Sequence, residues 1–114
     1  MKDCLFCRII AGEIPADKVY EDDLIIAFRD VNPQAPTHIL LIPKEHIATV
    51  NDLQKDHAEL IGHIHLQARA LAASEGIDEL GYRIVVNCLA DAGQSVFHLH
   101  FHLLGGRSMK WPPG

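Results

Sequence analysis

Apolar and polar side chains alternate along one stretch near the C-terminus, His98-Leu99-His100-Phe101-His102-Leu103-Leu104. Successive side chains of a β-strand point to opposite faces, so this stretch is predicted to be a strand with three imidazoles on one face and apolar side chains on the other. In a helix the same residues would turn by about 200° for every two positions, and the histidines would not share a face. One face of the predicted strand is therefore a candidate for chemistry, and the other belongs to the core.

Four more strands are predicted from shorter apolar and β-branched runs. They cover residues 19–21, 24–29, 37–43 and 81–88. Asp22-Asp23 is predicted to form the hairpin turn between the first two of these strands, and the last is expected to be a central strand.

Two helices are predicted from apolar residues spaced three and four apart. A short helix covers residues 4–10, and a long helix runs from Asp52 to Glu75, with Asn51 or Asp52 as its N-cap and Gly76 as its stop. Three histidines of the long helix are expected to face solvent: His57, His63 and His65. Five mostly antiparallel strands with one long helix on a face make an α+β domain, and a second copy of the chain is one candidate cover for the other face.

The composition is that of a globular protein. The 114 residues, 48% hydrophobic and 22% charged, suffice for a single domain spanning residues 1–114. No apolar run is long enough to cross a membrane, and Asp3, Arg8 and Glu13 interrupt the N-terminal stretch, so neither a membrane segment nor a signal peptide is expected. We therefore expect an intracellular, cytoplasmic protein.

The charge balance limits the partners. A formal net charge of -5 and a pI near 5.8 argue against the broad basic surface that nucleic acid backbones require. A single nucleotide is still a candidate ligand, because a small site can present local donors on an acidic protein.

Three cysteines, an odd number, do not suggest a disulfide framework. Cys88 lies in an apolar run and is interpreted as a small core residue. The Cys4-x-x-Cys7 pair is half of a tetrahedral zinc site, a redox pair, or two small apolar residues on a helix, and spacing alone does not choose among these.

The alternating histidines are the strongest candidates for chemistry. An unperturbed imidazole has a pKa of about 6.5, and neighbouring rings discourage one another's protonation, so these rings are expected to be largely neutral. A neutral histidine flanked by proton donors is a nucleophile. The alternative is a strand with solvent-facing or metal-binding histidines. His38 and His46, at either end of the strand at 37–43, are by spacing alone surface residues.

Two polar segments accompany the histidines. In the loop at 90–95, Gly93 allows backbone conformations that other residues rarely adopt, and Gln94 and Ser95 offer hydrogen-bond donors. This combination suits a phosphate-binding loop as well as an ordinary turn. Asp30 ends an apolar strand, where a carboxylate is either a turn former or a ligand group.

These stretches resemble the histidine triad (HIT) family, and within it the Hint branch of nucleoside phosphoramidases. The resemblance covers nearly the whole chain and rests on these segments: residues 6–15, Tyr20-Glu21-Asp22-Asp23, Ala27-Phe28-Arg29-Asp30, residues 33–38, residues 42–46, Gly93-Gln94-Ser95, residues 98–106 and Trp111-Pro112-Pro113-Gly114. It implies a homodimer whose two sheets join into one, with the C-terminal tail, residues 106–114, reaching the partner subunit.

The resemblance also implies an activity, the hydrolysis of nucleoside 5'-phosphoramidates such as adenosine 5'-monophosphoramidate and lysyl-type adenylates. His100 would attack phosphorus to form a nucleotidyl-histidine intermediate that water then hydrolyses, with no cofactor required. His38 and His98 would complete the histidine network. The remaining assignments are a base pocket of Phe6, Ile14 and Phe28, ribose hydroxyls on Asp30, and a phosphate and leaving-group site of Asn87, Gly93, Gln94, Ser95 and His102.

Some members of the wider family bind a structural zinc ion, and the matching residues here are Cys4, Cys7, His46 and His98. In that case His98 would be a metal ligand and not a catalytic group. Two other functions stay open: a zinc-dependent hydrolase in which the three alternating histidines hold the metal, and a nucleotide-binding scaffold without catalysis.

Overall fold

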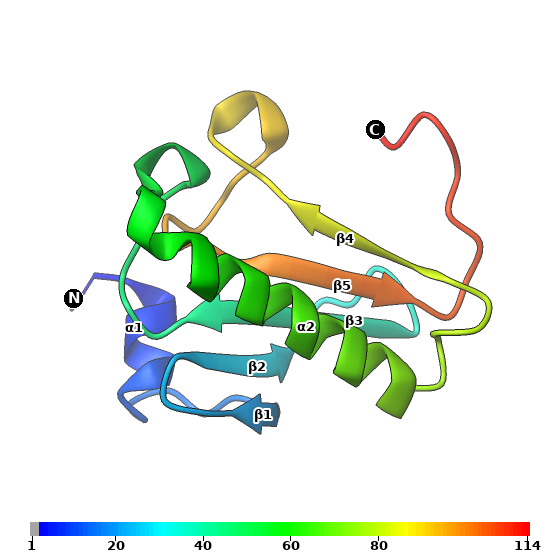
Figure 1. The fold of residues 1–114 in the computed structure, drawn as a ribbon, viewed down its shortest axis with the longest axis horizontal. Helices are drawn as coiled ribbons and strands as arrows, with labels where there is room; N and C mark the ends of the chain where they lie inside the picture. Colours follow the sequence, from blue (N-terminus) through cyan, green and yellow to red (C-terminus); the bar gives the residue numbers. More distant parts are fainter. Residues whose placement is uncertain (1–2) are drawn as a thin grey trace.

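The structure, a computed structural model, describes residues 3–114 and contains one antiparallel sheet with a helix on each face (Figure 1). The strands lie in the order β1-β2-β3-β5-β4, and every neighbouring pair is antiparallel. The elements in chain order are α1 (Leu5–Ile10), β1 (Lys18–Glu21), β2 (Ile25–Arg29), β3 (Thr37–Pro43), α2 (Ala58–Ser74), β4 (Tyr82–Val86) and β5 (Phe101–Gly105). The predicted α+β fold is confirmed.

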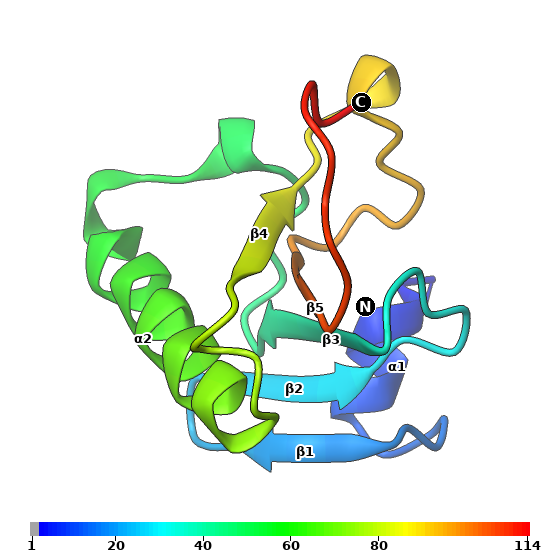
Figure 2. The same ribbon diagram turned by 90° about the vertical axis from the view of Figure 1, so that its right-hand side faces the viewer.

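The sheet separates two cores, because alternate residues of β3 and β5 point to opposite sides. Under α2 lies the larger core, which includes Leu99, Phe101 and Leu103. On the opposite face α1 and the segment after it cover a smaller core, which includes Phe28 and Leu40. Figure 2 shows α2 and α1 on the two sides of the sheet. Part of the second face, for which a second copy of the chain was a candidate cover, is thus covered by this chain's own short helix.

The alternation predicted for the histidine stretch is confirmed, although the strand is shorter than expected. Regular pairing with β3 and β4 begins only at Phe101, where Phe101 lies opposite Leu41 and Val86. Before it, the backbone N–H of Leu99 donates to the carbonyl of Ile47 outside the ladder. The three histidines still share the face that carries α1.

The long helix begins six residues later than predicted. Thr49 and Asp52 form a reciprocal capping box, in which the Thr49 hydroxyl accepts from a backbone N–H and the Asp52 carboxylate accepts from the backbone N–H of Thr49. This box closes a single 3₁₀ turn, and the extended conformation of Leu53 then ends it. Because the cap belongs to that separate turn, α2 starts only at Ala58, with His57 as its N-cap.

Strand β4 was expected in the centre of the sheet and lies at its edge. Its residues are half-buried up to Val86, which is exposed, and Cys88 after the strand is also half-buried, not a core residue. A strand with apolar residues on an open edge is a site where another strand can pair.

Two of the three helix histidines are not simply solvent-facing. His63 Nε2 lies 2.6 Å from a carboxylate oxygen of Asp22, and His57 Nε2 lies 3.2 Å from a carboxylate oxygen of Glu45. Both histidines are half-buried. His65 is exposed as predicted. No helix within residues 3–114 is long and apolar enough to cross a membrane.

Candidate active site and metal-binding group

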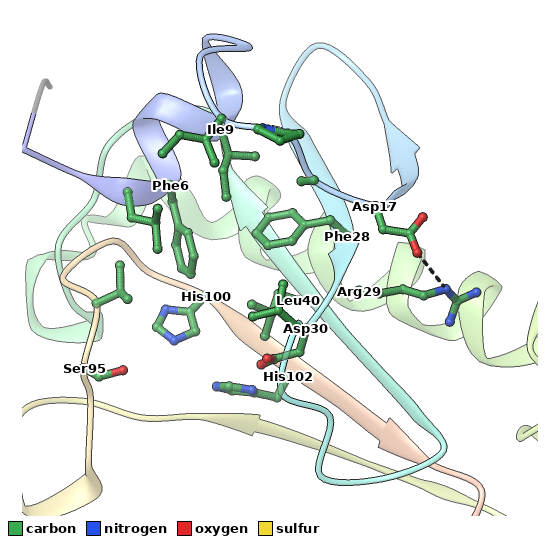
Figure 3. A pocket seen from close by; sticks show the side chains of 16 residues that line it. Phe6, Ile9, Asp17, Phe28, Arg29, Asp30, Leu40, Ser95, His100 and His102 are labelled. Carbon is green, nitrogen blue, oxygen red and sulfur yellow. Dashed lines mark ion pairs between the residues drawn. The ribbon is translucent and has the colours of Figure 1, made fainter.

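A cavity of about 550 Å³ opens on the α1 face of the sheet, where the apolar side chains of α1, β2 and β3 meet the histidine stretch (Figure 3). It brings together seven residues proposed from sequence: Phe6, Ile14, Phe28, Asp30, Ser95, His100 and His102. The nucleotide-site candidates Asn87, Gly93 and Gln94 do not line it. His38 and His98 reach it through His102 and His100.

The ring of His100 is held in one orientation and one tautomer. Its Nδ1 lies 2.7 Å from the carbonyl oxygen of His98, and a carbonyl accepts only from a protonated nitrogen, so Nδ1 carries the hydrogen. Phe6 packs edge-on against the same ring at a centroid distance of 5.1 Å. The lone pair of the neutral ring is therefore on Nε2, on the side away from the strand backbone, where the cavity lies.

His38 sets the tautomer of His102 in the same way. The backbone N–H of Gln34 donates to His38 Nδ1 at 3.0 Å, so a neutral His38 carries its hydrogen on Nε2. That nitrogen lies 2.9 Å from His102 Nδ1 and 3.4 Å from a carboxylate oxygen of Asp30. His102 therefore accepts at Nδ1 and presents Nε2–H as a donor.

Both of these histidines are neutral in the folded chain. Burial lowers the pKa of His38 below its ordinary value, against the opposing effect of Asp30. Burial, together with the neighbouring rings of His100 and His38, lowers the pKa of His102 to about 4. Removal from water is thus the main cause of the neutral state of both rings, and repulsion from neighbouring rings adds to it for His102.

Asp30 forms a turn and also lines the cavity. One carboxylate oxygen accepts from the backbone N–H of Asn32 at 2.8 Å, which closes a turn after β2. The other oxygen faces His38, and the side chain lines the cavity.

The loop before the histidines, residues 90–95, differs in part from the phosphate-binding loop that was predicted. The Gln94 amide is buried, where it donates to the carbonyls of Ala48 and Val96 and accepts from the backbone N–H of Leu89. The backbone N–H groups of Gly93 and Gln94 also donate within the loop, to Ala90 and Leu89. These donors hold the loop together, so among the predicted loop residues only Ser95 lines the cavity. Gly93 has a φ of +84°, which explains a glycine there.

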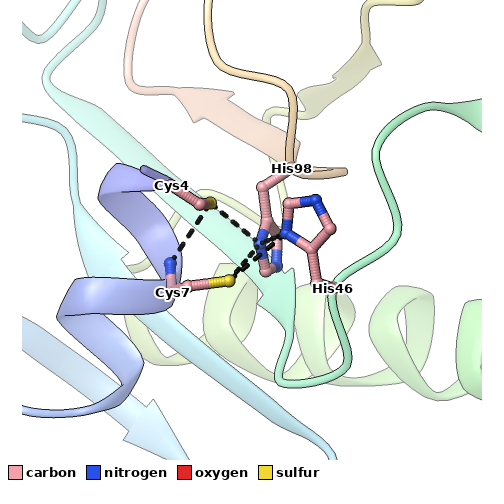
Figure 4. Close-up of side chains that lie close together, drawn as sticks. All are labelled: Cys4, Cys7, His46 and His98. Carbon is pink, nitrogen blue, oxygen red and sulfur yellow. Dashed lines mark hydrogen bonds between the residues drawn. The ribbon is translucent and has the colours of Figure 1, made fainter. Parts of the chain in front are cut away.

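A second cluster lies beside the first and contains Cys4, Cys7, His46 and His98 (Figure 4). His98 Nδ1 lies 3.4 and 3.5 Å from the two sulfur atoms and 3.1 Å from His46 Nδ1, and Cys7 Sγ lies 3.2 Å from His46 Nδ1. Tetrahedral zinc bonds imply ligand separations of about 3.3 Å between nitrogens and about 3.6 Å between nitrogen and sulfur. The four side chains fit a tetrahedral metal site.

The tautomer of His98 supports that reading. Its Nε2 lies 2.8 Å from the carbonyl oxygen of Pro43 and so carries the hydrogen, which leaves the Nδ1 lone pair directed at the thiols and His46. The ring is fully buried, and burial lowers its pKa, so it is neutral, as a metal ligand must be. Cys4 also caps α1 by accepting the backbone N–H of Cys7.

The three alternating histidines do not converge on one point, which contradicts a zinc-dependent hydrolase built on them. His98 belongs to the cysteine cluster, His100 faces the cavity, and His102 pairs with His38. Within residues 3–114 the other group with metal-ligand spacing is Asp30, His38 and His102. It fits a metal poorly, because the Gln34 N–H places the hydrogen of His38 on the nitrogen that would have to coordinate.

Sequence reasoning missed several apolar residues of the cavity wall: Leu5, Ile9, Pro15, Ala16, Leu40 and Val96. Leu40 could have been found, because it alternates with His38 along its strand and pairs with His102 in the sheet. The others depend on where α1 docks, which no local pattern states.

A sheet that sets an oriented imidazole from a row of three alternating histidines against a cavity is typical of the histidine triad class. The family model described as "Scavenger mRNA decapping enzyme C-term binding" matches residues 3–111. The chain belongs to the histidine triad family and is a HIT-type hydrolase.

Three relatives illustrate the similarity. The purine nucleoside phosphoramidase of Escherichia coli K12 is 50% identical over 108 residues, which cover 95% of this chain and 91% of that one. The 14 kDa zinc-binding protein of Zea mays is 48% identical over 112 residues, which cover 96% and 87%. The crystal structure of a HIT family hydrolase from Legionella pneumophila Philadelphia 1 superposes with a TM-score of 0.97 at 58% identity, over 98% of this chain and 100% of that one.

Proposed function

We propose that the chain hydrolyses nucleoside 5'-phosphoramidates, of the adenosine 5'-monophosphoramidate and aminoacyl or lysyl adenylate type, through a nucleotide covalently bound to His100. The observation that carries the proposal is the bond from His100 Nδ1 to the His98 carbonyl, which leaves a buried Nε2 lone pair facing the cavity. The similarity to a purine nucleoside phosphoramidase supports the choice of substrate.

The cavity offers a position for each part of such a substrate. The base lies among the apolar side chains of Phe6, Ile14 and Phe28, and the ribose hydroxyls donate to Asp30. The phosphate lies at Ser95, between His100 and His102. Asn87 and Gly93, on the segments that lead to this point, remain proposed phosphate contacts.

The reaction proceeds in two displacements. His100 Nε2 attacks phosphorus, the phosphorus–nitrogen bond to the amine breaks, and the amine leaves with a proton from His102. A water molecule then attacks phosphorus, its proton passes to His102, and the bond to His100 breaks to release the nucleoside monophosphate. No redox partner or further reactant is needed.

His102 can supply that proton once the phosphate is bound. Its pKa of about 4 keeps it neutral in the free chain. An anionic phosphate next to the ring stabilises the protonated form, so substrate and proton are expected to bind together. While His102 is neutral, His38 orients its ring, because the Nε2–H of His38 is aimed at the Nδ1 lone pair of His102.

We further propose that Cys4, Cys7, His46 and His98 bind zinc as a structural ion. A zinc ion held by these four residues would tie α1 and the segment after β3 to the histidine stretch. The naming of the maize relative as a zinc-binding protein supports this choice of metal.

The homodimer is also a proposal. Strand β4 leaves one edge of the sheet open, and the apolar side chains of Val86, Leu89 and Trp111 are exposed near it or on the tail, Trp111 to 82%. Pairing of two β4 edges would continue the sheet and cover these residues. Sedimentation of the purified chain at micromolar concentration tests this, and a monomer under those conditions contradicts it.

The test of the activity compares the wild type with His100→Ala on adenosine 5'-monophosphoramidate, with and without EDTA. His65→Ala is the matched control, because His65 is exposed on α2 away from the cavity. Turnover that survives EDTA and His65→Ala but is lost in His100→Ala supports the proposal. Turnover retained by His100→Ala contradicts the nucleophile, and a wild type that binds AMP without hydrolysis indicates a binding protein.

A further inference from the structure

The side chains of β2 alternate between the two faces of the sheet up to the point where the strand ends. Ala27 belongs to the larger core under α2, and Phe28 belongs to the smaller core under α1. By the same alternation Arg29 is directed to the α2 side, and Asp30 is directed to the α1 side, where it lines the cavity. Figure 3 shows these two side chains directed away from each other. A contact that fixes Arg29 therefore also constrains Asp30.

Arg29 is held on the α2 side by a bidentate ion pair. Its Nη1 and Nη2 lie 2.8 and 2.9 Å from the two carboxylate oxygens of Glu75, the C-cap residue of α2. This geometry fixes the direction of a guanidinium as well as its position. The Asp17 carboxylate, 3.9 Å from Arg29 Nε and largely exposed, adds a weaker contact. The hydrogen bonds from Arg29 lower the pKa of Glu75, so the pair is charged near neutral pH.

Asp30 depends on such an anchor because the chain leaves the sheet directly after it. Arg29 and Ile39 are the last residue pair of β2 and β3, and beyond them the Asp30 N–H donates to the His38 carbonyl at 3.0 Å. Residues 31–34 are then exposed. A strand end next to an exposed loop opens more readily than the middle of a sheet. Because a hydrogen bond requires a separation of about 3 Å, a small displacement of this end would remove the Asp30 carboxylate from a bound ribose.

We propose that Arg29 is a positioning residue: its ion pair with Glu75 holds the Asp30 carboxylate where it accepts the ribose hydroxyls, and so makes the hydrolase selective for ribonucleotides. This proposal rests on the proposed phosphoramidate hydrolysis and on the ribose position given with it. Glu75 is not among the residues that line the cavity, so it acts on the substrate only through Arg29.

The experiment compares the 5'-phosphoramidates of adenosine and of 2',3'-dideoxyadenosine, which differ only in the two hydroxyls. The ribose preference is the ratio of kcat/KM for the first substrate to kcat/KM for the second. In Arg29→Gln this preference should fall about tenfold, because a displaced carboxylate loses a charge-assisted hydrogen bond. The loss should appear as a higher KM for the adenosine substrate, while kcat/KM for the dideoxy substrate stays within about twofold of wild type.

Glu75→Ala tests whether the effect passes through the ion pair. This variant should lower the ribose preference as Arg29→Gln does, although the residue lies outside the cavity lining. The double variant should lower it no further than Arg29→Gln alone, because the two side chains act as a unit. Arg29→Lys keeps the charge without the bidentate geometry and should give an intermediate preference, and it serves in place of Arg29→Gln if that variant folds poorly.

Lys44→Gln is the matched control. It breaks an ion pair of similar length and exposure, in which Lys44 Nζ lies 2.9 Å from a carboxylate oxygen of Glu21, and neither residue lines the cavity. Its ribose preference should stay within about twofold of wild type, whatever its melting temperature. If Arg29→Gln and Glu75→Ala lower the melting temperature but leave the ribose preference unchanged, the ion pair only stabilises the fold and the proposal is overturned.

The outcomes also separate this proposal from the one on which it rests. A wild type that hydrolyses both substrates equally well retains the hydrolase and refutes the ribose contact of Asp30, and with it the positioning role. A wild type that hydrolyses neither substrate but binds AMP refutes the hydrolase. The ratio of the dissociation constants for AMP and its dideoxy analogue, measured by calorimetry on the same variants, then decides the positioning role.

Discussion

His98 and His100 lie two residues apart on one face of the sheet, yet they present opposite ring nitrogens. The Pro43 carbonyl accepts a hydrogen bond from His98 Nε2–H, so the Nδ1 lone pair of His98 faces the cysteine cluster. The His98 carbonyl accepts a hydrogen bond from His100 Nδ1–H, so the Nε2 lone pair of His100 faces the cavity. A single backbone acceptor thus decides which ring nitrogen of a buried histidine keeps its lone pair, facing the cysteine cluster in His98 and the cavity in His100.

The two environments are also joined, because His98 belongs to both. Its ring contributes to the cysteine cluster while its carbonyl orients His100, and Phe6 packs against both rings, at 6.0 Å from His98 and 5.1 Å from His100. We therefore expect that substitutions at the His100 cavity alter hydrolysis, and that substitutions in the cysteine cluster alter the free energy of unfolding.

The largest effect is expected from His100→Asn. Loss of the nucleophile should lower kcat for adenosine 5'-monophosphoramidate at least about 10³-fold, while zinc content by atomic absorption stays at the wild-type level. Loss of zinc from this variant would show that the two environments are not separable.

The double variant Cys4→Ser and Cys7→Ser should reverse that pattern. At zinc concentrations 100 to 1,000 times the dissociation constant, binding stabilises the folded wild type by about 3–4 kcal/mol, and the double variant should lose this gain. Urea unfolding with zinc and with chelator measures the difference. Equal stabilisation of the double variant by zinc would place the metal elsewhere.

The pH dependence of stability should report on His102. Its pKa is about 4 in the folded chain and about 6.5 in an unfolded one, so between these values the unfolded chain binds the extra proton. The free energy of unfolding should therefore be fully retained above pH about 6.5 and fall by about 2 kcal/mol as the pH drops toward 4, with allowance for partial exposure. Urea unfolding across this range should show a shallower fall in His102→Gln, with the remainder due to His38 and His98, whose pKa values are also lowered.

The smallest effect is expected from Phe6→Leu, which lies between the two environments. Replacing the ring should destabilise the chain by about 1–2 kcal/mol, because an aromatic contact is lost while most of the buried volume is kept. It should raise KM for the phosphoramidate a few-fold without changing zinc content. A change in kcat alone would indicate that Phe6 acts by orienting His100 and not by binding the base.

The sequence alone determined the sheet faces and the stretch that carries the candidate site. Strict alternation at residues 98–104 assigned each side chain to a face, because a strand has a period of two whatever surrounds it. The turn at Asp22-Asp23 and the buried strand at 37–43 followed from local pattern in the same way, whereas the four residues of the candidate metal site followed from the family resemblance.

The tertiary structure decided what local pattern cannot state. It made β4 an edge, moved the start of α2 to Ala58, enclosed the Gln94 amide within its own loop and paired His63 with Asp22. It also separated three equivalent-looking histidines: His98 lies in the cysteine cluster, His100 faces the cavity and His102 pairs with His38. The reason is that a tautomer depends on which polar group lies within about 3 Å of each ring. For His98 and His102 these groups belong to Pro43 and His38, far away in the chain, whereas for His100 the acceptor is the carbonyl of His98, two residues before it.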